Sequence, residues 1–439
     1  MNLSTLKDKE MWKIMPENIN KFFLDSIWTA NNDGPKPDLS EHLKFCRLDN
    51  DKNQFLYVYK PRKPYIDLDG IKSFVKFLHT IPIDIKGKSI LPIFIDLQDV
   101  CFADKLVYVM METIIHYLIE NKNWLVTVQG TIKPENCSNG VNYSSLTYGN
   151  WSISTMSKKT FKDTVSNENC IRRRYYKYNR KETDELSYTR FFVNQTNNIN
   201  NIASDIYSFF NNSSIIKSIE KDKINCLFHT IMEMISNSTE HAQSPYIYDI
   251  DLRKVTHQLN ADLQGKEYIA INVALWDFSN VRIGDAIKRK IHIIDSLSPT
   301  DDKYIEQIGL KGEIYKKLLT CYHIHNSFWD QHYTEDEFFA LAAFQPGITG
   351  RANPGSTGGA GLSHVLDFLF DYPDNYRCYC LTGDTIINLN KDYLLKDTDK
   401  WYSFTKNGFF SSSKPCEKCI TKSNFFYPGT AFFLHLELN

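Results

Sequence analysis

The chain has 439 residues, of which 42% are hydrophobic, enough for two or three domains with buried cores. Its formal net charge of −1 provides no overall attraction to nucleic acid, and no apolar run reaches the roughly 18 residues that span a bilayer. Ten scattered cysteines and an N-terminus without an apolar signal core predict a reduced, cytoplasmic protein.

The first part of the chain predicts two regions. Residues 1–50 have a polar, helical pattern, and residues 51–195 alternate between strand and helix patterns. In the second region, 55–59 predicts a strand and 69–79 predicts an amphipathic helix. We therefore expect a helical N-terminal segment followed by an α/β domain.

A βαβ unit is predicted within that domain. Residues 91–97 and 124–128 have the apolar character of buried strands, and an apolar helix at 102–118 lies between them. A helical crossover predicts parallel strands. The stretch resembles the STAS domain of anti-sigma-factor antagonists, in which a strand ends at an Asp-Ser pair that caps a helix. Here the pair is Asp104 and Lys105, so the phosphorylatable serine is absent, and Asp104 is expected to cap the helix or lie in its first turn.

The densest basic run is 172–180, where tyrosines are interleaved with arginines. Single-stranded nucleic acid is bound by such patterns, but they are also typical of a solvated strand or linker. Neighbouring acids favour the second interpretation, so no nucleic-acid partner is expected. An Asn-rich stretch at 194–201 then predicts a boundary, with a further domain over 196–439.

Residues 223–242 predict the amphipathic helix around which this further domain is organised. Glu233, Asn237 and His241 follow one another at a spacing of four, so they form a polar stripe along the helix. A carboxylate can deprotonate a water molecule, and an amide oxygen is a hard ligand suited to Mg²⁺. The alternative interpretation is a half-exposed helix with a polar side.

The next elements are a strand and a helix. The alternating strand 268–276 ends at Asp277, and Gly284 follows in the loop. Residues 335–344 predict a helix capped by Thr334.

A glycine-rich segment at 345–361 follows that helix. Its glycines permit backbone N–H groups to approach a polyphosphate closely. The chain enters another helix at Leu362, and a final strand begins near Thr430.

In type and order these elements resemble the nucleotide-binding boxes of the GHKL superfamily, which includes DNA gyrase, histidine kinases and MutL. Asp277 matches the acid that binds the adenine amino group, and Thr430 matches the Gly-Thr element that closes the pocket. Ser279 and Val281 stand where the family has glycines. The resemblance implies the following nucleotide-binding residues: Asn237, His241, Asp277, Gly284, Gly347, Thr349, Arg351, Gly358, Gly359, Gly361, Leu362 and Thr430.

The resemblance implies an α/β protein whose C-terminal domain is a GHKL-type sandwich, a mixed sheet with helices on one face. It implies an ATPase in which Glu233 is the general base and Asn237 is a Mg²⁺ ligand. The STAS-like domain would couple nucleotide state to a protein partner, and a homodimer is compatible with this arrangement. The alternatives are an anti-sigma-type Ser/Thr kinase and a nucleotide-gated binding module with little hydrolysis.

Two sets of residues have metal-ligand side chains. The first could form a zinc site, although buried thiols and a free loop pair are the favoured interpretation: Cys378, Cys380, Cys416 and Cys419. The second has a spacing that fits no zinc signature, so a packed helix is expected there: Cys321, His323, His325 and His332.

Overall fold

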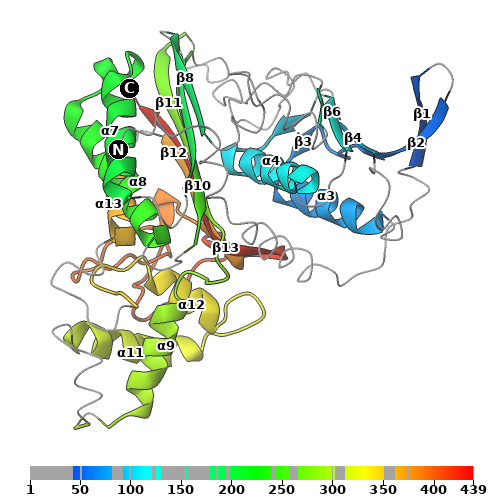
Figure 1. Cartoon of the computed structure of the whole chain (residues 1–439). Helices are drawn as coiled ribbons and strands as arrows, with labels where there is room; N and C mark the ends of the chain where they lie inside the picture. The colour runs from blue at the N-terminus through cyan, green and yellow to red at the C-terminus, as the bar shows by residue number, and fades with distance from the viewer. Residues whose placement is uncertain are drawn as a thin grey trace. The chain divides into compact units, whose positions relative to one another are not determined.

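The computed structural model describes residues 43–49, 52–81, 92–97, 100–120, 125–129, 154–156, 177–183, 186–193, 198–239, 244–256, 265–298, 300–301, 312–350, 361–372 and 375–438. The chain forms two compact units (Figure 1): unit 1 is Met1–Asn179 with Arg190–Thr196, and unit 2 is Arg180–Thr189 with Asn197–Asn439. Arg180–Thr189, which the sequence places in the first domain, thus belongs to unit 2.

The described part of unit 1 contains a mixed five-stranded sheet, a two-stranded sheet of β3 and β5, and two helices. Its elements are β1 (Leu43–Asp49), β2 (Lys52–Tyr59), β3 (Tyr65–Ile66), α3 (Leu68–Thr80), β4 (Pro92–Asp96), β5 (Cys101–Phe102), α4 (Lys105–Glu120), β6 (Leu125–Gln129) and β7 (Ser154–Met156). The sheet has the order β1-β2-β4-β6-β7. β4 is parallel to both β2 and β6, so the predicted parallel βαβ unit is confirmed.

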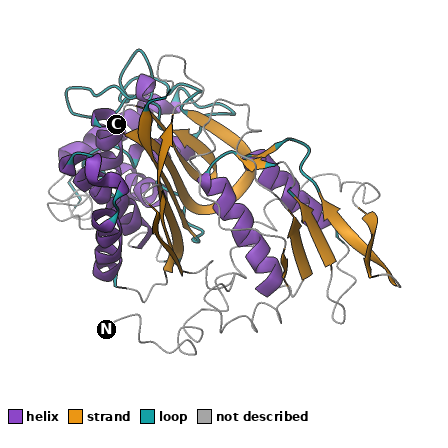
Figure 2. Cartoon of the chain, turned by 90° about the horizontal axis from the view of Figure 1, so that it is seen from above, coloured by secondary structure: helices purple, strands orange, loops and turns teal. Residues whose placement is uncertain are grey.

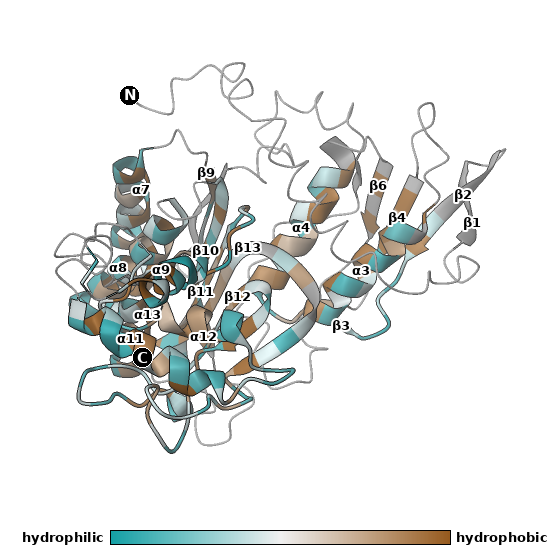
Figure 3. Ribbon diagram, turned by 90° about the horizontal axis from the view of Figure 1, so that it is seen from below, coloured by the Kyte–Doolittle hydropathy of each residue, from teal (hydrophilic) through white to brown (hydrophobic). Residues whose placement is uncertain are grey.

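Helices α3 and α4 each begin at an aspartate. Asp67 accepts a hydrogen bond from the Gly70 N–H at the start of α3, and Asp104 accepts one from the Val107 N–H at the start of α4, each at 2.9 Å. The expected capping role of Asp104 is therefore confirmed. Figure 3 shows apolar and polar residues alternating along α3 and α4, and apolar side chains such as Phe74 are fully buried.

The helical segment predicted for residues 1–50 is wrong over residues 43–49. Leu43–Asp49, expected to be helical as part of 1–50, is strand β1 and pairs antiparallel with β2. The register places Phe45 opposite Phe55, and this cross-strand pairing favours a strand in a way that local sequence does not reveal. Residues 1–42 lie outside the described residues.

Unit 2 is built on a six-stranded sheet. Its elements include β8 (Lys177–Thr183), β9 (Leu186–Val193), α7 (Ile199–Asn212), η6 (Ile215–Ser218), α8 (Lys221–Asn237), β10 (Tyr246–Thr256), β11 (Glu267–Asp277), α9 (Asp285–Ser296), α11 (Gly312–Asn326), α12 (Glu335–Ala342), α13 (Gly361–Asp371), β12 (Asn375–Asn388), η9 (Lys391–Tyr393) and β13 (Ile420–Leu438). The strand order is β12-β13-β11-β10-β9-β8. Strands β10, β11, β13 and β12 pair antiparallel in turn. The resemblance implied a mixed sheet, but these four strands contain no parallel pair.

Helices α7, α8 and α13 stand along one face of this sheet (Figures 1 and 2), and α8 contacts both of the others. The apolar face predicted for α8 is buried, including Leu227, Ile231 and Met234. Phe228, at the margin of that face, is only half-buried and meets the ring of Tyr207 from α7. The sequence pattern therefore orients α8 on the sheet, with its polar stripe at the margin of the packed face.

Cysteine side chains in the described residues are mostly free. Cys101 is disulfide-bonded, and six others are free thiols. The disulfide at Cys101 differs from the reduced protein expected from the sequence, whereas the six free thiols agree with the expectation that the cysteines do not form a disulfide framework. Within the described ranges, no helix combines the length and the apolar character needed to cross a membrane.

Candidate functional site

Four residues lie in one row across the unit 2 sheet, at the ends of β10 and β11 and in the middle of β13 and β12. Tyr246 at the start of β10 pairs with Asp277 at the end of β11. Trp276, the neighbour of Asp277, pairs with Ala431 of β13, and Thr430 pairs with Thr382 of β12. We call Tyr246, Asp277, Thr430 and Thr382 the Asp277 row. The register thus brings Asp277 and Thr430, two predicted site residues, together.

Asp277 is a buried carboxyl group within a shell of hydrogen-bond donors. Its Oδ1 accepts hydrogen bonds from the Ser279 hydroxyl at 2.7 Å and from the Ser279 N–H at 3.1 Å. Burial raises the pKa of Asp277 to about 6, and the donors on Ser279 and the N–H of Thr430 offset part of that rise. This carboxyl group is therefore a preorganised acceptor at one end of the sheet.

Gly429 makes this close packing possible. A Cβ added at Gly429 would lie 2.3 Å from the Asp277 carbonyl oxygen and 2.5 Å from its Oδ1. The residue also has a φ of +77°, which favours glycine. The Gly-Thr sequence at 429–430 is thus required by contact with Asp277, in addition to any contact with a ligand.

The loop after Asp277 contacts strand β12 and helix α12. The Ile283 N–H donates to the Thr382 hydroxyl at 2.9 Å. Gly284 begins α9 with a φ of +92°, and its missing side chain lets the loop approach α12, since a Cβ there would lie 2.5 Å from the Phe339 carbonyl. The structure therefore gives Gly284 a packing role next to the Asp277 row.

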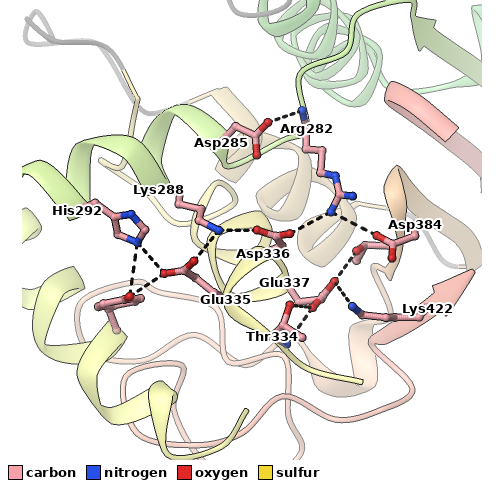
Figure 4. A network of polar contacts seen from close by, with 12 residues as sticks. Arg282, Asp285, Lys288, His292, Thr334, Glu335, Asp336, Glu337, Asp384 and Lys422 are labelled. Atoms are coloured by element: carbon pink, nitrogen blue, oxygen red, sulfur yellow. Dashed lines mark hydrogen bonds and ion pairs between the residues drawn. The ribbon is translucent and has the colours of Figure 1, made fainter. Parts of the chain in front are cut away.

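A network of ion pairs fastens the same loop (Figure 4). Arg282 bridges Asp336 of α12 at 3.1 Å and Asp384 of β12 at 3.3 Å. Lys288 of α9 bridges Asp336 and Glu335. Partial burial would raise the pKa of Glu335, but donors including Lys288 lower it to about 2.

Behind this network lies a capping box. Glu337 is fully buried, and it accepts hydrogen bonds from the Thr334 N–H and hydroxyl and from the Thr385 hydroxyl (Figure 4). The N-cap role predicted for Thr334 is therefore confirmed.

The end of α8 carries two further residues of the predicted site, Glu233 and Asn237. Asn237 is the last residue of α8, and its Nδ2 donates to the Glu233 carbonyl at 2.9 Å. Because a carbonyl only accepts, the amide nitrogen of Asn237 must face it, and the amide oxygen takes no part in this hydrogen bond. Both side chains are half-buried. His241 lies outside the described residues.

This helix end reaches the Asp277 row through Thr239. The Thr239 hydroxyl donates to Ile235 of its own helix and lies close to the Tyr246 hydroxyl, without normal hydrogen-bond geometry. Burial raises the pKa of Tyr246 to about 12. Because Tyr246 pairs with Asp277, Tyr246 lies between Thr239, which follows α8, and the end of β11.

The described part of the glycine-rich segment packs on α9 and α11. Thr349 is buried, and its carbonyl accepts a hydrogen bond from Tyr315 of α11 at 2.7 Å. Gly347 has a φ of +82°, and Gly350 touches Ala286 of α9 so closely that a Cβ would lie 2.2 Å from the alanine Cβ.

The rest of that segment is described only at its end, where Gly361 begins α13 and Leu362 is buried. Three predicted nucleotide contacts lie outside the described residues: Arg351, Gly358 and Gly359.

The possible metal ligands are dispersed. Among the described residues, no group of three or more His, Cys, Asp or Glu is placed to hold a metal ion. Cys378 and Cys380 are buried in β12, where burial raises the pKa of both thiols. His325 is buried between the Tyr333 hydroxyl and the Phe410 carbonyl, at 2.6 and 2.5 Å, which is the packed arrangement expected for its helix.

Sequence reasoning did not predict the roles of two residues at the Asp277 row, Ser279 and Thr382. Ser279 donates twice to Asp277, although it stands where a glycine was expected. Thr382 joins β12, the loop and β13, and its only sequence signal is the following Gly383 within a strand pattern, which indicates a bulge.

Comparison of the chain with protein-family models, curated proteins and solved structures finds no match.

Proposed function

We propose that unit 2 binds ATP at the Asp277 row in the manner of the GHKL superfamily. The supporting observation is one buried carboxyl group, Asp277 at the end of β11, which lies beside Thr430 in the middle of β13 and pairs with Tyr246 at the start of β10. Asp277 offers an acceptor to the adenine amino group, and Thr430 lies beside it. The order of these elements along the chain also agrees with the resemblance.

The residues at the end of α8 fit a magnesium ion. The Asn237 amide nitrogen is occupied by the Glu233 carbonyl, and the amide oxygen, which takes no part in that bond, is the proposed hard ligand. Bound Mg²⁺ would neutralise phosphate charge during phosphoryl transfer. The Asn237 side chain would hold this ion, while phosphate contacts from the glycine-rich segment remain a prediction from sequence.

Glu233 is the proposed general base for hydrolysis. It lies one helical turn before Asn237, and its half-buried carboxylate could take a proton from an attacking water. A Ser/Thr kinase of the anti-sigma type would use the same residues and transfer the phosphoryl group to a protein hydroxyl.

A nucleotide-gated binding module is the second candidate. One observation favours it: Ser279 and Val281 stand where the family has glycines in the loop after Asp277, and Ser279 donates two hydrogen bonds to Oδ1 of Asp277. In either case, the proposal includes a regulatory protein partner reached through the STAS-like unit 1, a cytoplasmic location and a possible homodimer.

Calorimetric titration of Mg·ATP tests the binding proposal. Asp277→Ala removes the acceptor for the amino group, and a lost buried hydrogen bond of about 1–3 kcal/mol should weaken binding about ten- to a hundredfold. Asp222→Ala, at an exposed position in the first turn of α8, is the matched control and should retain wild-type affinity. Equal affinity in Asp277→Ala and wild type would refute the assignment of Asp277.

A further inference from the structure

The Tyr246 hydroxyl is a buried polar group without a hydrogen-bond partner. Tyr246 is 2% exposed, and its hydroxyl oxygen makes no hydrogen bond within the ranges that the structure describes. An unpaired buried hydroxyl group costs stability, because folding removes it from water without supplying a replacement partner. Such a group in a folded protein requires an explanation, and a ligand that completes the hydrogen bond is one.

Thr239, which follows the end of α8, has a hydroxyl group close to that of Tyr246. The Thr239 hydroxyl donates its own proton to the Ile235 carbonyl at 3.0 Å, and it does not meet the Tyr246 hydroxyl with normal hydrogen-bond geometry. Burial raises the pKa of Tyr246 to about 12, so its hydroxyl is protonated at neutral pH. Tyr246 therefore holds an unused proton that it can donate to an acceptor.

The strand register places this donor beside the acceptor at Asp277. Tyr246 and Asp277 are directly opposite each other in the antiparallel pair of β10 and β11. Residues in that relation lie on the same face of a sheet, with Cβ atoms about 4.5–5.5 Å apart. The edge of adenine has the complementary groups, because its amino group is a donor and the ring nitrogens N1 and N7 on either side of it are acceptors.

We propose that Tyr246 is a binding residue of the Asp277 row, whose hydroxyl donates to a ring nitrogen that flanks the amino group of bound adenine. This inference rests on the proposed function, because it names a second contact to the base that Asp277 binds. The bound base removes the cost of the unpaired hydroxyl. Folding and binding thus make opposite demands on Tyr246, as is common for residues retained for function.

Tyr246→Phe removes the hydroxyl and keeps the buried ring. In the absence of nucleotide the urea midpoint should not fall, because no hydrogen bond is lost. Binding of Mg·ATP to the full-length variant, measured by calorimetry, should be about tenfold weaker than in wild type, because the contact to the base is lost. A residue that only packs in the core would not separate these two measurements in this way.

Tyr188→Phe is the matched control. The Tyr188 hydroxyl of β9 donates to Asp249 of β10 at 2.6 Å, and both residues are buried. Side chains alternate along a strand, so Asp249 and Tyr246 lie on opposite faces of β10. Tyr188→Phe makes the same chemical change at a hydroxyl that already has a partner. It should lower the urea midpoint and retain wild-type affinity for Mg·ATP.

Two ATP analogues identify the atom that Tyr246 contacts. In 1-deaza-ATP and 7-deaza-ATP a carbon replaces N1 or N7, so each analogue lacks one acceptor. Wild type should bind one of the two about tenfold more weakly than ATP, and Tyr246→Phe should have no further effect on that analogue. The same substitution should still weaken the other analogue about tenfold, because its acceptor is intact.

Wild-type ATP affinity in Tyr246→Phe would overturn the proposal, as would an equal loss of affinity for ATP and both analogues. A lower urea midpoint in Tyr246→Phe would overturn it too, because the hydroxyl would then have a partner in the free protein. If wild type binds no ATP, the proposed function and the Tyr246 contact both fail. If Asp277→Ala weakens binding and Tyr246→Phe does not, the proposed function stands and only the Tyr246 contact fails.

Discussion

Asp277 is both buried and surrounded by hydrogen-bond donors, and these two properties shift its pKa in opposite directions. Its carboxyl group is buried, which raises its pKa from an ordinary 3.8 to about 6 and makes its charged form costly at neutral pH. Its donors, Ser279 and the Thr430 N–H, hold the group in one orientation. A carboxylate that costs stability while being held in place is the pattern expected of a binding residue.

This cost predicts a pH-dependent stability difference between wild type and Asp277→Asn. Because the folded pKa lies above the unfolded value, protonation favours the folded state as the pH falls from about 7 through 6 to 4, and the benefit is lost as the pH rises. Wild type should gain about 2 kcal/mol relative to Asp277→Asn between pH 7 and pH 4, measured by urea unfolding. A constant difference between wild type and Asp277→Asn would contradict the shifted pKa, and exposed Asp222→Asn supplies the control.

At the scale of elements, the contact between the start of α9 and α12 sets the position of the loop that follows Asp277. Gly284 allows the contact through its positive φ and its missing side chain. Arg282 and Lys288 reinforce it through acids on α12 and β12. The loop is therefore fixed by packing and charge, although it lacks the glycines of the family pattern.

Gly284→Ala should disrupt this contact. Its Cβ would lie 2.5 Å from the Phe339 carbonyl at a φ of +92°, so both strain and overlap apply, and we expect a loss of about 2–4 kcal/mol in the free energy of unfolding. Gly265→Ala is the matched control, because Gly265 has a φ of +83° and no atom within 4 Å of the added Cβ. It should lose only about 1 kcal/mol. Equal losses would show that the contact with α12 contributes nothing.

Local patterns predicted the elements well, and pairing between distant segments was less accessible. The period of apolar residues identified α8 and β11, and the cap of α12 at Thr334 follows from its own neighbouring acids. Strand β1 was missed because its conformation depends on a partner strand. The link between Tyr402 and Gln345 joins residues far apart in sequence, and no local pattern encodes it.

At the scale of the molecule, the proposed site takes its residues from three separate parts of unit 2. The end of α8 supplies Glu233 and Asn237, β11 supplies Asp277, and β13 supplies Thr430. The sequence named all four residues, but only the strand register relates Asp277 to Thr430. These residues are the basis for the central proposal, that unit 2 binds ATP at the Asp277 row with Mg²⁺ held by Asn237.

Glu233 and Asn237 should separate binding from turnover, which makes them the most direct test. Asn237→Ala removes the proposed metal ligand and should abolish both tight Mg·ATP binding and phosphate release. Glu233→Ala removes the general base and should retain wild-type affinity while phosphate release falls about 10²–10⁴-fold. Calorimetry and a phosphate-release assay on wild type and both variants, with Mg²⁺ present, provide the measurement. Tight binding in wild type and Glu233→Ala, lost in Asn237→Ala, is the predicted result, and wild-type affinity in Asn237→Ala would contradict the account.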